Sequence, residues 1–268
     1  MNKIPKVIHY CWFGRNPLPK EALRCMESWK QFCPDYEIKR WDEENFDVNA
    51  CRFSRQAYEN GKFAFVSDYA RIKVIYEEGG IYLDTDVELL KSLDPLLEDS
   101  LYLGAEGTMH VATGLGFGAT AGHPYLKDSL QIYENMDFSD ESGNITARNC
   151  PYYNTEICKK YGGVFPVTEV QRTESMALYP NDYFNPYDWK RNKLKVTDHT
   201  FSIHNYAATW MTESQKRALI INAKLQKIEN RFGGTARKLS EFFVWNSRKN
   251  GGAGVLHGIR NRFFGNSQ

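Results

Sequence analysis

The stretch "FVSDYARIKVIYEEGGIYLDTDVELL", residues 65–90, combines a helical pattern, a pair of glycines, a short apolar run and two aspartates. Ser67 or Asp68 can cap a helix, and apolar residues follow at helical spacing until Gly79 and Gly80 end it. The segment after the glycines reads as a strand that runs into a loop. The stretch therefore predicts a helix, a tight turn and a strand with two carboxylates at its end.

The two aspartates, Asp84 and Asp86, are separated by one residue. Strand residues alternate between the two faces of a sheet, so both side chains would point the same way if the strand extends to them. Converging carboxylates repel each other unless a cation lies between them, and such oxygen ligands suit Mg²⁺ or Mn²⁺. That ion would neutralise a departing diphosphate. Aspartate is also a common turn residue, and the pair taken alone is more typical of a plain turn.

The first 90 residues follow a strand-and-helix rhythm. The apolar run at 6–13 predicts a buried strand, the stripe at 19–32 a helix and the alternation at 36–42 a second strand. This rhythm is typical of a doubly wound α/β sheet. Ligands of such sheets bind beyond the carboxyl ends of the strands, where Asp84 and Asp86 are expected.

The rest of the chain predicts further elements. They are a strand at 101–106, a glycine-rich strand or loop at 113–120, helices at 123–136 and 149–162, and a last strand entering a loop at 199–210.

Composition excludes several classes of protein. With 42% hydrophobic and 14% aromatic residues the chain is not disordered, and no apolar window is long enough to span a bilayer. The N-terminus has no signal-peptide pattern, so we expect a cytoplasmic protein, free or at the inner face of the membrane. The six cysteines form no C-x-x-C pair, which suits a reducing compartment and argues against structural zinc.

The charge is unevenly distributed. From Gln215 to the end there are 11 lysines and arginines against two acidic residues, whereas the first 214 residues carry 23 against 31. Lys224, Lys227 and Arg231 flank an apolar helical stripe. Such a basic amphipathic helix suits an anionic membrane surface, and a helical appendix packed on the catalytic domain is the equal alternative. Nucleic-acid binding is disfavoured because no recognition motif appears.

Three segments together resemble glycosyltransferase family 32, the D-x-D sugar transferases that include capsular polysaccharide enzymes, and the related large glucosylating bacterial toxins. They are "IPKVIHYCWFG" (4–14), the block at 63–90 and "HNYAATW" (204–210), which is similar to a closing H-x(4)-S-W element. The resemblance implies a GT-A type (Rossmann-like) mixed sheet flanked by helices over residues 1–212. It also implies a nucleotide-sugar donor and Mn²⁺ or Mg²⁺. Residues 213–268 would then form a basic helical extension.

The same resemblance assigns roles to individual residues. Asp84, Asp86 and Arg71 would form the catalytic centre, and Asp86, Asp84 and His204 would hold the metal. The implied donor-binding residues are Trp12 against the base, Ser67, Asp68, Arg71 and Asp84, with Thr209 and Trp210 at the diphosphate. Thr209 stands where the family usually has serine, so the hydroxyl is kept. Asp86 is the favoured direct metal ligand, and Asp84 would be shared between ribose and metal.

The residues alone leave plainer readings open for several of these positions. Trp12 could be a core residue, Asp68 and Arg71 a helix cap with a surface pair, and His204 a buried structural histidine. The resemblance further implies retention of the anomeric configuration without a dedicated protein base. Glu106 is placed on the acceptor side only by its position after a strand. A UDP-hexose is the preferred donor and GDP-mannose the alternative, with a saccharide or lipid-linked saccharide as acceptor.

Two other functions compete with this one. A haloacid-dehalogenase-type phosphotransferase would use Asp84 as nucleophile, because "YLDTDV" satisfies its first motif. About 80 residues precede the motif here, which is unlike that class, and no second acidic motif follows. A non-catalytic carbohydrate-binding protein would not need two convergent carboxylates beside an arginine.

Overall fold

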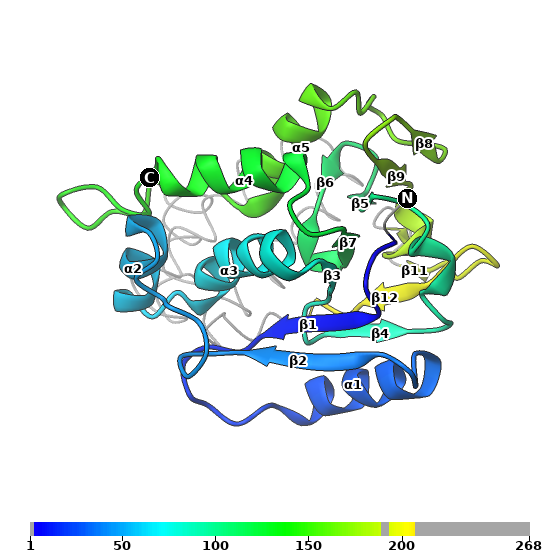
Figure 1. Ribbon diagram of the computed structural model, residues 1–268, viewed down its shortest axis with the longest axis horizontal. Coiled ribbons are helices and arrows are strands. Elements are labelled where there is room, and N and C mark those ends of the chain that lie inside the picture. Colours follow the sequence, from blue (N-terminus) through cyan, green and yellow to red (C-terminus); the bar gives the residue numbers. More distant parts are fainter. Residues whose placement is uncertain (1–2, 189–192, 207–268) are drawn as a thin grey trace, which may run out of the picture. The chain divides into compact units, whose positions relative to one another are not determined.

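The computed structural model describes residues 3–188 and 193–206 of the 268-residue chain. Within these residues a mixed β-sheet is flanked by helices, as Figure 1 shows, which confirms the predicted α/β class. The predicted extension at 213–268, together with Thr209 and Trp210, lies outside the described residues. The domain boundary after residue 212 therefore stays a prediction.

The described elements have the following bounds. The helices are α1 (Lys20–Phe32), α2 (Arg52–Glu59), α3 (Phe63–Glu78), α4 (Pro124–Glu134) and α5 (Cys150–Lys160), with the 3-10 turns η1 (Asp94–Leu96), η2 (Thr113–Leu115) and η3 (Asn181–Tyr183). The strands are β1 (Val7–Cys11), β2 (Glu37–Trp41), β3 (Gly80–Tyr82), β4 (Val87–Leu89), β5 (Leu101–Glu106), β6 (His110–Val111), β7 (Phe117–Ala119), β8 (Gln171–Arg172), β9 (Ala177–Tyr179), β10 (Tyr187–Asp188), β11 (Lys193–Leu194) and β12 (Ser202–His204).

The main sheet has the strand order β2-β1-β3-β7-β5-β9-β8, with β6 paired to β5. Strand β1 pairs in parallel with both β2 and β3, whereas β7 is antiparallel to β3 and to β5. Because β1 and β3 run the same way, the residues that follow them emerge at one edge of the sheet. This edge receives Trp12 after β1 and the D-x-D segment after β3.

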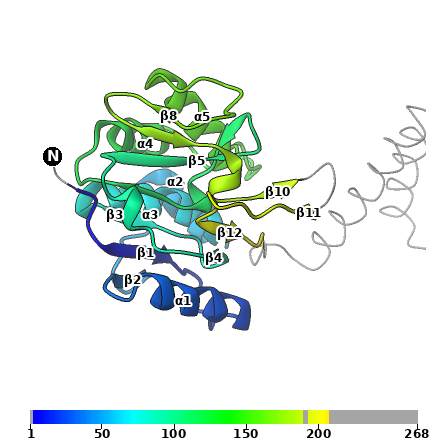
Figure 2. The same cartoon turned by 90° about the vertical axis from the view of Figure 1, so that its right-hand side faces the viewer.

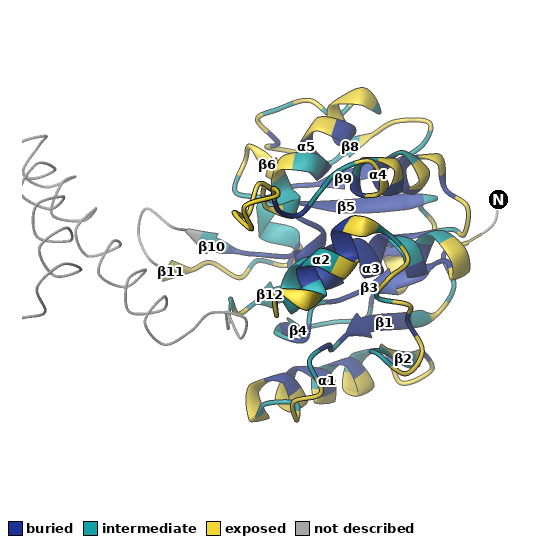
Figure 3. Cartoon of the chain, turned by 90° about the vertical axis from the view of Figure 1, so that its left-hand side faces the viewer, coloured by how far each residue is buried: buried dark blue, intermediate teal, exposed yellow. Residues whose placement is uncertain are grey.

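Side chains of one strand divide between two hydrophobic clusters because strand residues alternate faces. In β5, Leu101, Leu103 and Ala105 join the cluster that includes α2 to α5, whereas Tyr102 joins the cluster that includes α1. Figure 3 shows the strands buried between helices whose outer sides are exposed. The sheet is therefore covered on both faces, and its carboxyl edge is the place left for a ligand.

Helix α3 carries the acidic and basic residues of the predicted site. It begins at Phe63, one turn before the predicted caps, so the expectation that Ser67 or Asp68 starts the helix is wrong. The Ser67 hydroxyl instead donates a hydrogen bond of 3.0 Å to the Phe63 carbonyl, within the helix. Serine and aspartate compete for backbone groups in this way inside helices as well as at their ends.

The two glycines after α3 are required by close packing. Gly79 has φ 71° and Gly80 has φ 104°, in the left-handed region that disfavours other residues. A Cβ atom at Gly79 would lie 2.9 Å from the Ala121 nitrogen, and one at Gly80 would lie 2.8 Å from the Val7 carbonyl oxygen. The pair therefore ends α3 as predicted and lets β3 enter the sheet directly beside β1.

Two further features differ from the sequence prediction. Helix α2 was not predicted, so two helices rather than one separate β2 from β3. The predicted strand that runs into a loop is confirmed as β3, which ends at Tyr82, but the second strand β4, starting at Val87, was not predicted. Of the described helices, none is long and apolar enough to cross a membrane.

Candidate active site

The D-x-D segment forms the turn between β3 and β4. The Val87 amide donates to the Asp84 carbonyl oxygen at 3.0 Å, which closes the turn around Thr85 and Asp86. The aspartates are therefore not consecutive same-face residues of a strand, and the alternation argument for their convergence is wrong. The turn produces the convergence instead, since it folds the two carboxylates toward one side.

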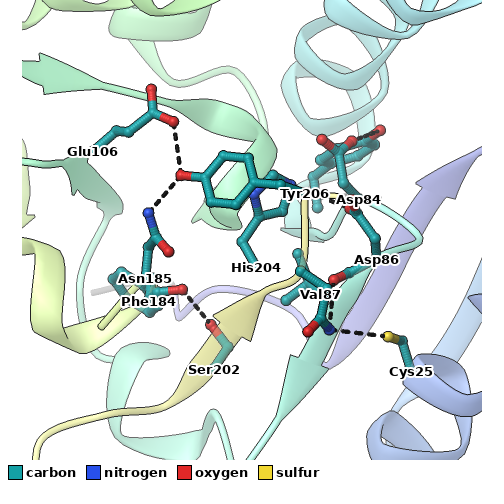
Figure 4. A network of polar contacts seen from close by, with 12 residues as sticks. Cys25, Asp84, Asp86, Val87, Glu106, Phe184, Asn185, Ser202, His204 and Tyr206 are labelled. Carbon is teal, nitrogen blue, oxygen red and sulfur yellow. Dashed lines mark hydrogen bonds and ion pairs between the residues drawn. The ribbon is translucent and has the colours of Figure 1, made fainter. Parts of the chain in front are cut away.

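Strand β12 brings His204 to this turn from the far end of the described chain. It pairs antiparallel with β4, with His204 opposite Val87, and the Asn205 amide continues the pairing at 3.0 Å from the Asp86 carbonyl oxygen. The His204 Nε2 atom lies 3.2 Å from Asp86 Oδ1. Figure 4 shows His204 and the two aspartates together, and Figure 2 shows β12 alongside β4.

Asp84, Asp86 and His204 could hold a divalent cation. Each offers one ligand atom, and these atoms lie within 4.8 Å of one another. The His204 Nδ1 atom is buried and has no hydrogen-bond partner among the described residues. Two carboxylate oxygens and one imidazole nitrogen suit Mn²⁺, and a mainly oxygen site also admits Mg²⁺. The donor set therefore fits the predicted metal.

Arg71 is the buried cation behind the turn. Its Nη2 atom lies 3.1 Å from Asp68 Oδ1 and 3.2 Å from Asp84 Oδ1, and its Nε donates to the Ser67 carbonyl oxygen at 3.1 Å. The guanidinium carbon is 4.8 Å from the centre of the Tyr82 ring, and the Tyr82 hydroxyl donates to Asp84 Oδ1 at 2.9 Å. These contacts fix the orientation of Asp84.

The ionisable groups of the site shift one another's pKa values. Burial raises the pKa of Asp68 to about 6, with the positive charge of Arg71 opposing the shift. Burial also raises the pKa of Asp84, again opposed by Arg71 and increased by the charge of Asp86. Burial lowers the pKa of His204, but its hydrogen bond to Asp86 and the surrounding negative charges outweigh this, so the net shift is upward.

The remaining predicted donor residues lie near the same edge or outside the described chain. Trp12 follows β1 and is partly buried, and its Nε1 donates to the Asn16 carbonyl oxygen at 2.6 Å. The Ser67 hydroxyl is occupied within its own helix. Thr209 and Trp210 lie outside the described residues, so their placement stays a prediction.

Gly114 is a residue of the site that sequence reasoning missed. A Cβ atom at Gly114, in η2, would lie 2.5 Å from Asp84 Oδ2 and 3.2 Å from Arg71 Nη1. Glycine is therefore required where this backbone approaches the acid and the arginine. The glycine-rich composition of 113–120 was a usable signal, because glycines in a strand or loop often mark close backbone approach.

Comparison with known proteins supports a sugar transferase. Residues 19–103 match the family model described as the glycosyltransferase sugar-binding region containing a DXD motif. This match supports a glycosyltransferase. The matched region includes Arg71, Asp84 and Asp86, the residues that the structure brings together.

The matched relatives are glycosyltransferases. Inositol phosphoceramide mannosyltransferase 3 of Schizosaccharomyces pombe is 30% identical over 137 residues, which is 50% of this chain and 37% of the relative. An uncharacterized glycosyltransferase of Acanthamoeba polyphaga mimivirus is 24% identical, covering 76% of this chain and 83% of the relative. Lactosylceramide 4-alpha-galactosyltransferase of Mus musculus is 23% identical, covering 71% and 54%. The chain spans only 37% and 43% of two S. pombe mannosyltransferases that it matches.

Solved structures of similar shape include the PaToxG glycosyltransferase. It is 18% identical, and the similarity covers 59% of this chain and 69% of that chain with a TM-score of 0.47. The galactosyltransferase LgtC, solved with donor and acceptor sugar analogues, is 13% identical with a TM-score of 0.34 over 78% of this chain and 91% of that chain.

Proposed function

We propose that this chain is a metal-dependent glycosyltransferase of the GT-A type, which moves a hexose from a nucleotide sugar to a saccharide or lipid-linked saccharide acceptor. The observation that carries the proposal is the cluster of Asp84, Asp86 and His204 at the carboxyl edge of the sheet, with Arg71 directly behind it. The family match over the D-x-D region supports the same reaction class.

The residues of the site divide the work of sugar transfer between them. Asp84, Asp86 and His204 would hold Mn²⁺ or Mg²⁺, which supplies positive charge to a departing diphosphate. Arg71 holds Asp84 in place through their ion pair, and the backbone at Gly114 closes the rear of the site. Asp84 and Asp86 therefore enter the reaction pre-oriented, so that no reorganisation is needed when charge develops on the leaving group.

The position of Trp12 at the edge of the sheet supports a choice of donor, and the names of the relatives support a choice of acceptor. Trp12 emerges beside the D-x-D turn and can stack on a base. A stacking site the size of uracil makes a UDP-hexose the preferred donor over GDP-mannose. Relatives named for inositol phosphoceramide and lactosylceramide support an acceptor linked to a lipid. A role in capsule or surface polysaccharide synthesis agrees with the resemblance to the capsular enzymes.

Transfer would proceed with retention of the anomeric configuration. The departing phosphate then assists attack by the acceptor on the same face, so no protein group is assigned as general base. Glu106 is the carboxylate placed on the acceptor side, and its Oε1 accepts a hydrogen bond of 2.8 Å from the Tyr206 hydroxyl. Because Glu106 holds this hydrogen bond, we assign it a role in binding and orienting the acceptor rather than that of a general base.

The site of action would be the cytoplasm, with peripheral attachment to the inner face of the membrane through residues 213–268. The excess of bases in that part of the sequence supports attraction to anionic lipids. Peripheral attachment would place the active site next to acceptors that are themselves anchored in the bilayer.

One assay distinguishes the transferase from its competitors. The full chain is incubated with Mn²⁺ and a panel of UDP- and GDP-sugars, and nucleotide release and donor binding are measured. We expect release of UDP that requires the metal and that falls at least 100-fold in the Asp84→Asn/Asp86→Asn double variant. Circular dichroism verifies that the variant is folded.

Two results would reject the proposal. Phosphate release from small phosphoesters without donor binding would identify a phosphotransferase with Asp84 as nucleophile. Saccharide binding with no turnover of any donor, and no effect of the double substitution, would identify a carbohydrate-binding protein.

A further inference from the structure

Tyr206 is a second residue that contacts His204, and it has no role in the proposed reaction so far. The two ring centres are 4.2 Å apart, and the ring planes are inclined at 76°. This is an edge-to-face contact, which restricts rotation of both rings. Figure 4 shows the tyrosine between His204 and Glu106.

The Tyr206 hydroxyl is anchored by two elements distant from β12 in the sequence. It donates to Glu106 Oε1 at 2.8 Å, at the end of β5, and it accepts a hydrogen bond from Asn185 Nδ2, just after η3. Asn185 is fully buried and Glu106 belongs to the main sheet. The ring is therefore held at its hydroxyl end by the body of the fold.

The backbone of Tyr206 is also unusual. Its φ is 48°, in the left-handed region that costs a residue with a side chain about 1 kcal/mol. The residue before it, Asn205, still continues the ladder, because its backbone amide donates a hydrogen bond to the Asp86 carbonyl oxygen. Tyr206 therefore departs from strand geometry directly after the ladder, at the position where its ring contacts His204.

We propose that Tyr206, anchored by Glu106 and Asn185, is the positioning residue that fixes the imidazole of His204 for cation binding. Asp86 contacts one edge of that imidazole through Nε2, and Tyr206 packs against the ring itself. Without the anchored ring, His204 could rotate away from the two carboxylates. The inference rests on the proposed function, because it requires the three groups to hold a metal.

The test measures Mn²⁺ binding by the full chain without any donor. The signal of free aqueous Mn²⁺ in electron paramagnetic resonance gives the Kd directly. Tyr206→Phe keeps the ring and removes the anchor, and we expect its Kd to rise about tenfold, at the lower end of what loss of a ligand-orienting partner produces. With substrate, the Mn²⁺ concentration for half-maximal rate should rise by the same factor.

A second variant removes the other partner of the Tyr206–Glu106 hydrogen bond. Glu106→Ala removes the acceptor of the Tyr206 hydroxyl, and it also removes a negative charge that helps to raise the pKa of His204. We expect the loss of Mn²⁺ affinity in the double variant Tyr206→Phe/Glu106→Ala to be smaller than the sum of the two single losses, because Tyr206→Phe already breaks the hydrogen bond that Glu106→Ala removes. Fully additive losses would contradict a common anchor.

The matched control is Tyr161→Phe. Its hydroxyl donates to Asp128 Oδ2 at the same distance of 2.8 Å, between α4 and the end of α5, and this variant should bind Mn²⁺ like the wild type. A folded Tyr206→Phe protein with wild-type Mn²⁺ affinity would overturn the positioning role and leave the proposed function intact. A wild-type chain that binds no Mn²⁺ would reject both.

Discussion

Arg71 shows how one buried residue can orient several groups of the site. Its side chain is only 4% exposed, and its nitrogens are directed at the Ser67 carbonyl, Asp68 and Asp84. A buried guanidinium is tolerated only with such compensation, and removing one carboxylate would leave an unbalanced charge. The arginine therefore orients Asp84 from behind, in addition to the donor contact that the resemblance implies.

Proton competition should make metal binding depend on pH. The pKa values of His204 and Asp84 are both raised, so both groups bind protons at higher pH than usual. Protonated His204 cannot donate an electron pair to a metal, and its pKa is raised from an ordinary value of 6.5, so the Mn²⁺ Kd should increase as the pH falls from 8 to 6. The increase reaches up to about tenfold per pH unit for each proton displaced.

Calorimetry in two buffers of different ionisation enthalpy checks this expectation. The difference in observed enthalpy counts the protons released on Mn²⁺ binding, which should be more numerous at pH 6 than at pH 8. Equal affinity at both pH values, with no proton release, would contradict a site in which His204 is a ligand.

Among individual residues, sequence spacing predicted only part of the site. Asp68 and Arg71 are one helical turn apart, and their pairing follows from local geometry. His204 was named only through resemblance, because no period links it to Asp86 across 118 residues. Tyr206 and Gly114 gave still less signal, since their roles depend on contacts made by other segments.

At the scale of elements, β4 is held between β12 and α1. The fully buried Trp29 of α1 donates through its indole Nε1 to the Val87 carbonyl oxygen at 2.7 Å. The Ser28 hydroxyl accepts from the Leu89 amide at 2.9 Å. Helix α1 therefore supports the strand that carries the D-x-D turn, although it contributes no residue to the predicted donor or metal site.

Trp29→Phe should destabilise the fold, because it removes this hydrogen bond from α1 to β4. The change leaves the Val87 carbonyl without its donor and creates a small cavity, so the free energy of unfolding should fall by about 2–4 kcal/mol. Urea unfolding followed by circular dichroism measures the loss. Trp12→Phe is the matched control, because Trp12 is only partly buried, and its stability should change by less than about 1 kcal/mol.

Elements with strong periodicity were predicted well, and those fixed by packing were not. Strands β1, β2 and β5 and helices α1, α4 and α5 lie where the patterns place them. Helix α2 has only eight residues, too few for a clear apolar period. The start of α3 was misplaced because its N-cap is Lys62, which makes no side-chain capping bond, while the better capping residues lie inside the helix.

At the scale of the whole molecule, membrane attachment can be tested in the intact chain. Substituting Lys224, Lys227 and Arg231 by glutamine removes three charges from the basic extension. If those bases contact phospholipids, binding to vesicles of anionic lipid should weaken by about 3 kcal/mol, or roughly 100-fold. Liposome flotation measures the change, and vesicles of neutral lipid serve as the control.

Unaltered flotation of the triple variant would show that these bases do not contact lipid. The alternative of a helical appendix that packs on the catalytic domain would then be favoured. Nucleotide release from a soluble donor should be the same in both proteins, because none of the three bases belongs to the proposed metal and donor site.

The ladder between β4 and β12 also determines when the candidate cation site can first form during synthesis of the chain. A ribosome that has exposed the entire D-x-D turn must still add 118 residues before the imidazole of His204 can reach Asp86. Nascent and truncated chains therefore carry the signature motif without the complete cation site. On the proposed function, only chains in which these distant segments have already met would consume nucleotide sugar.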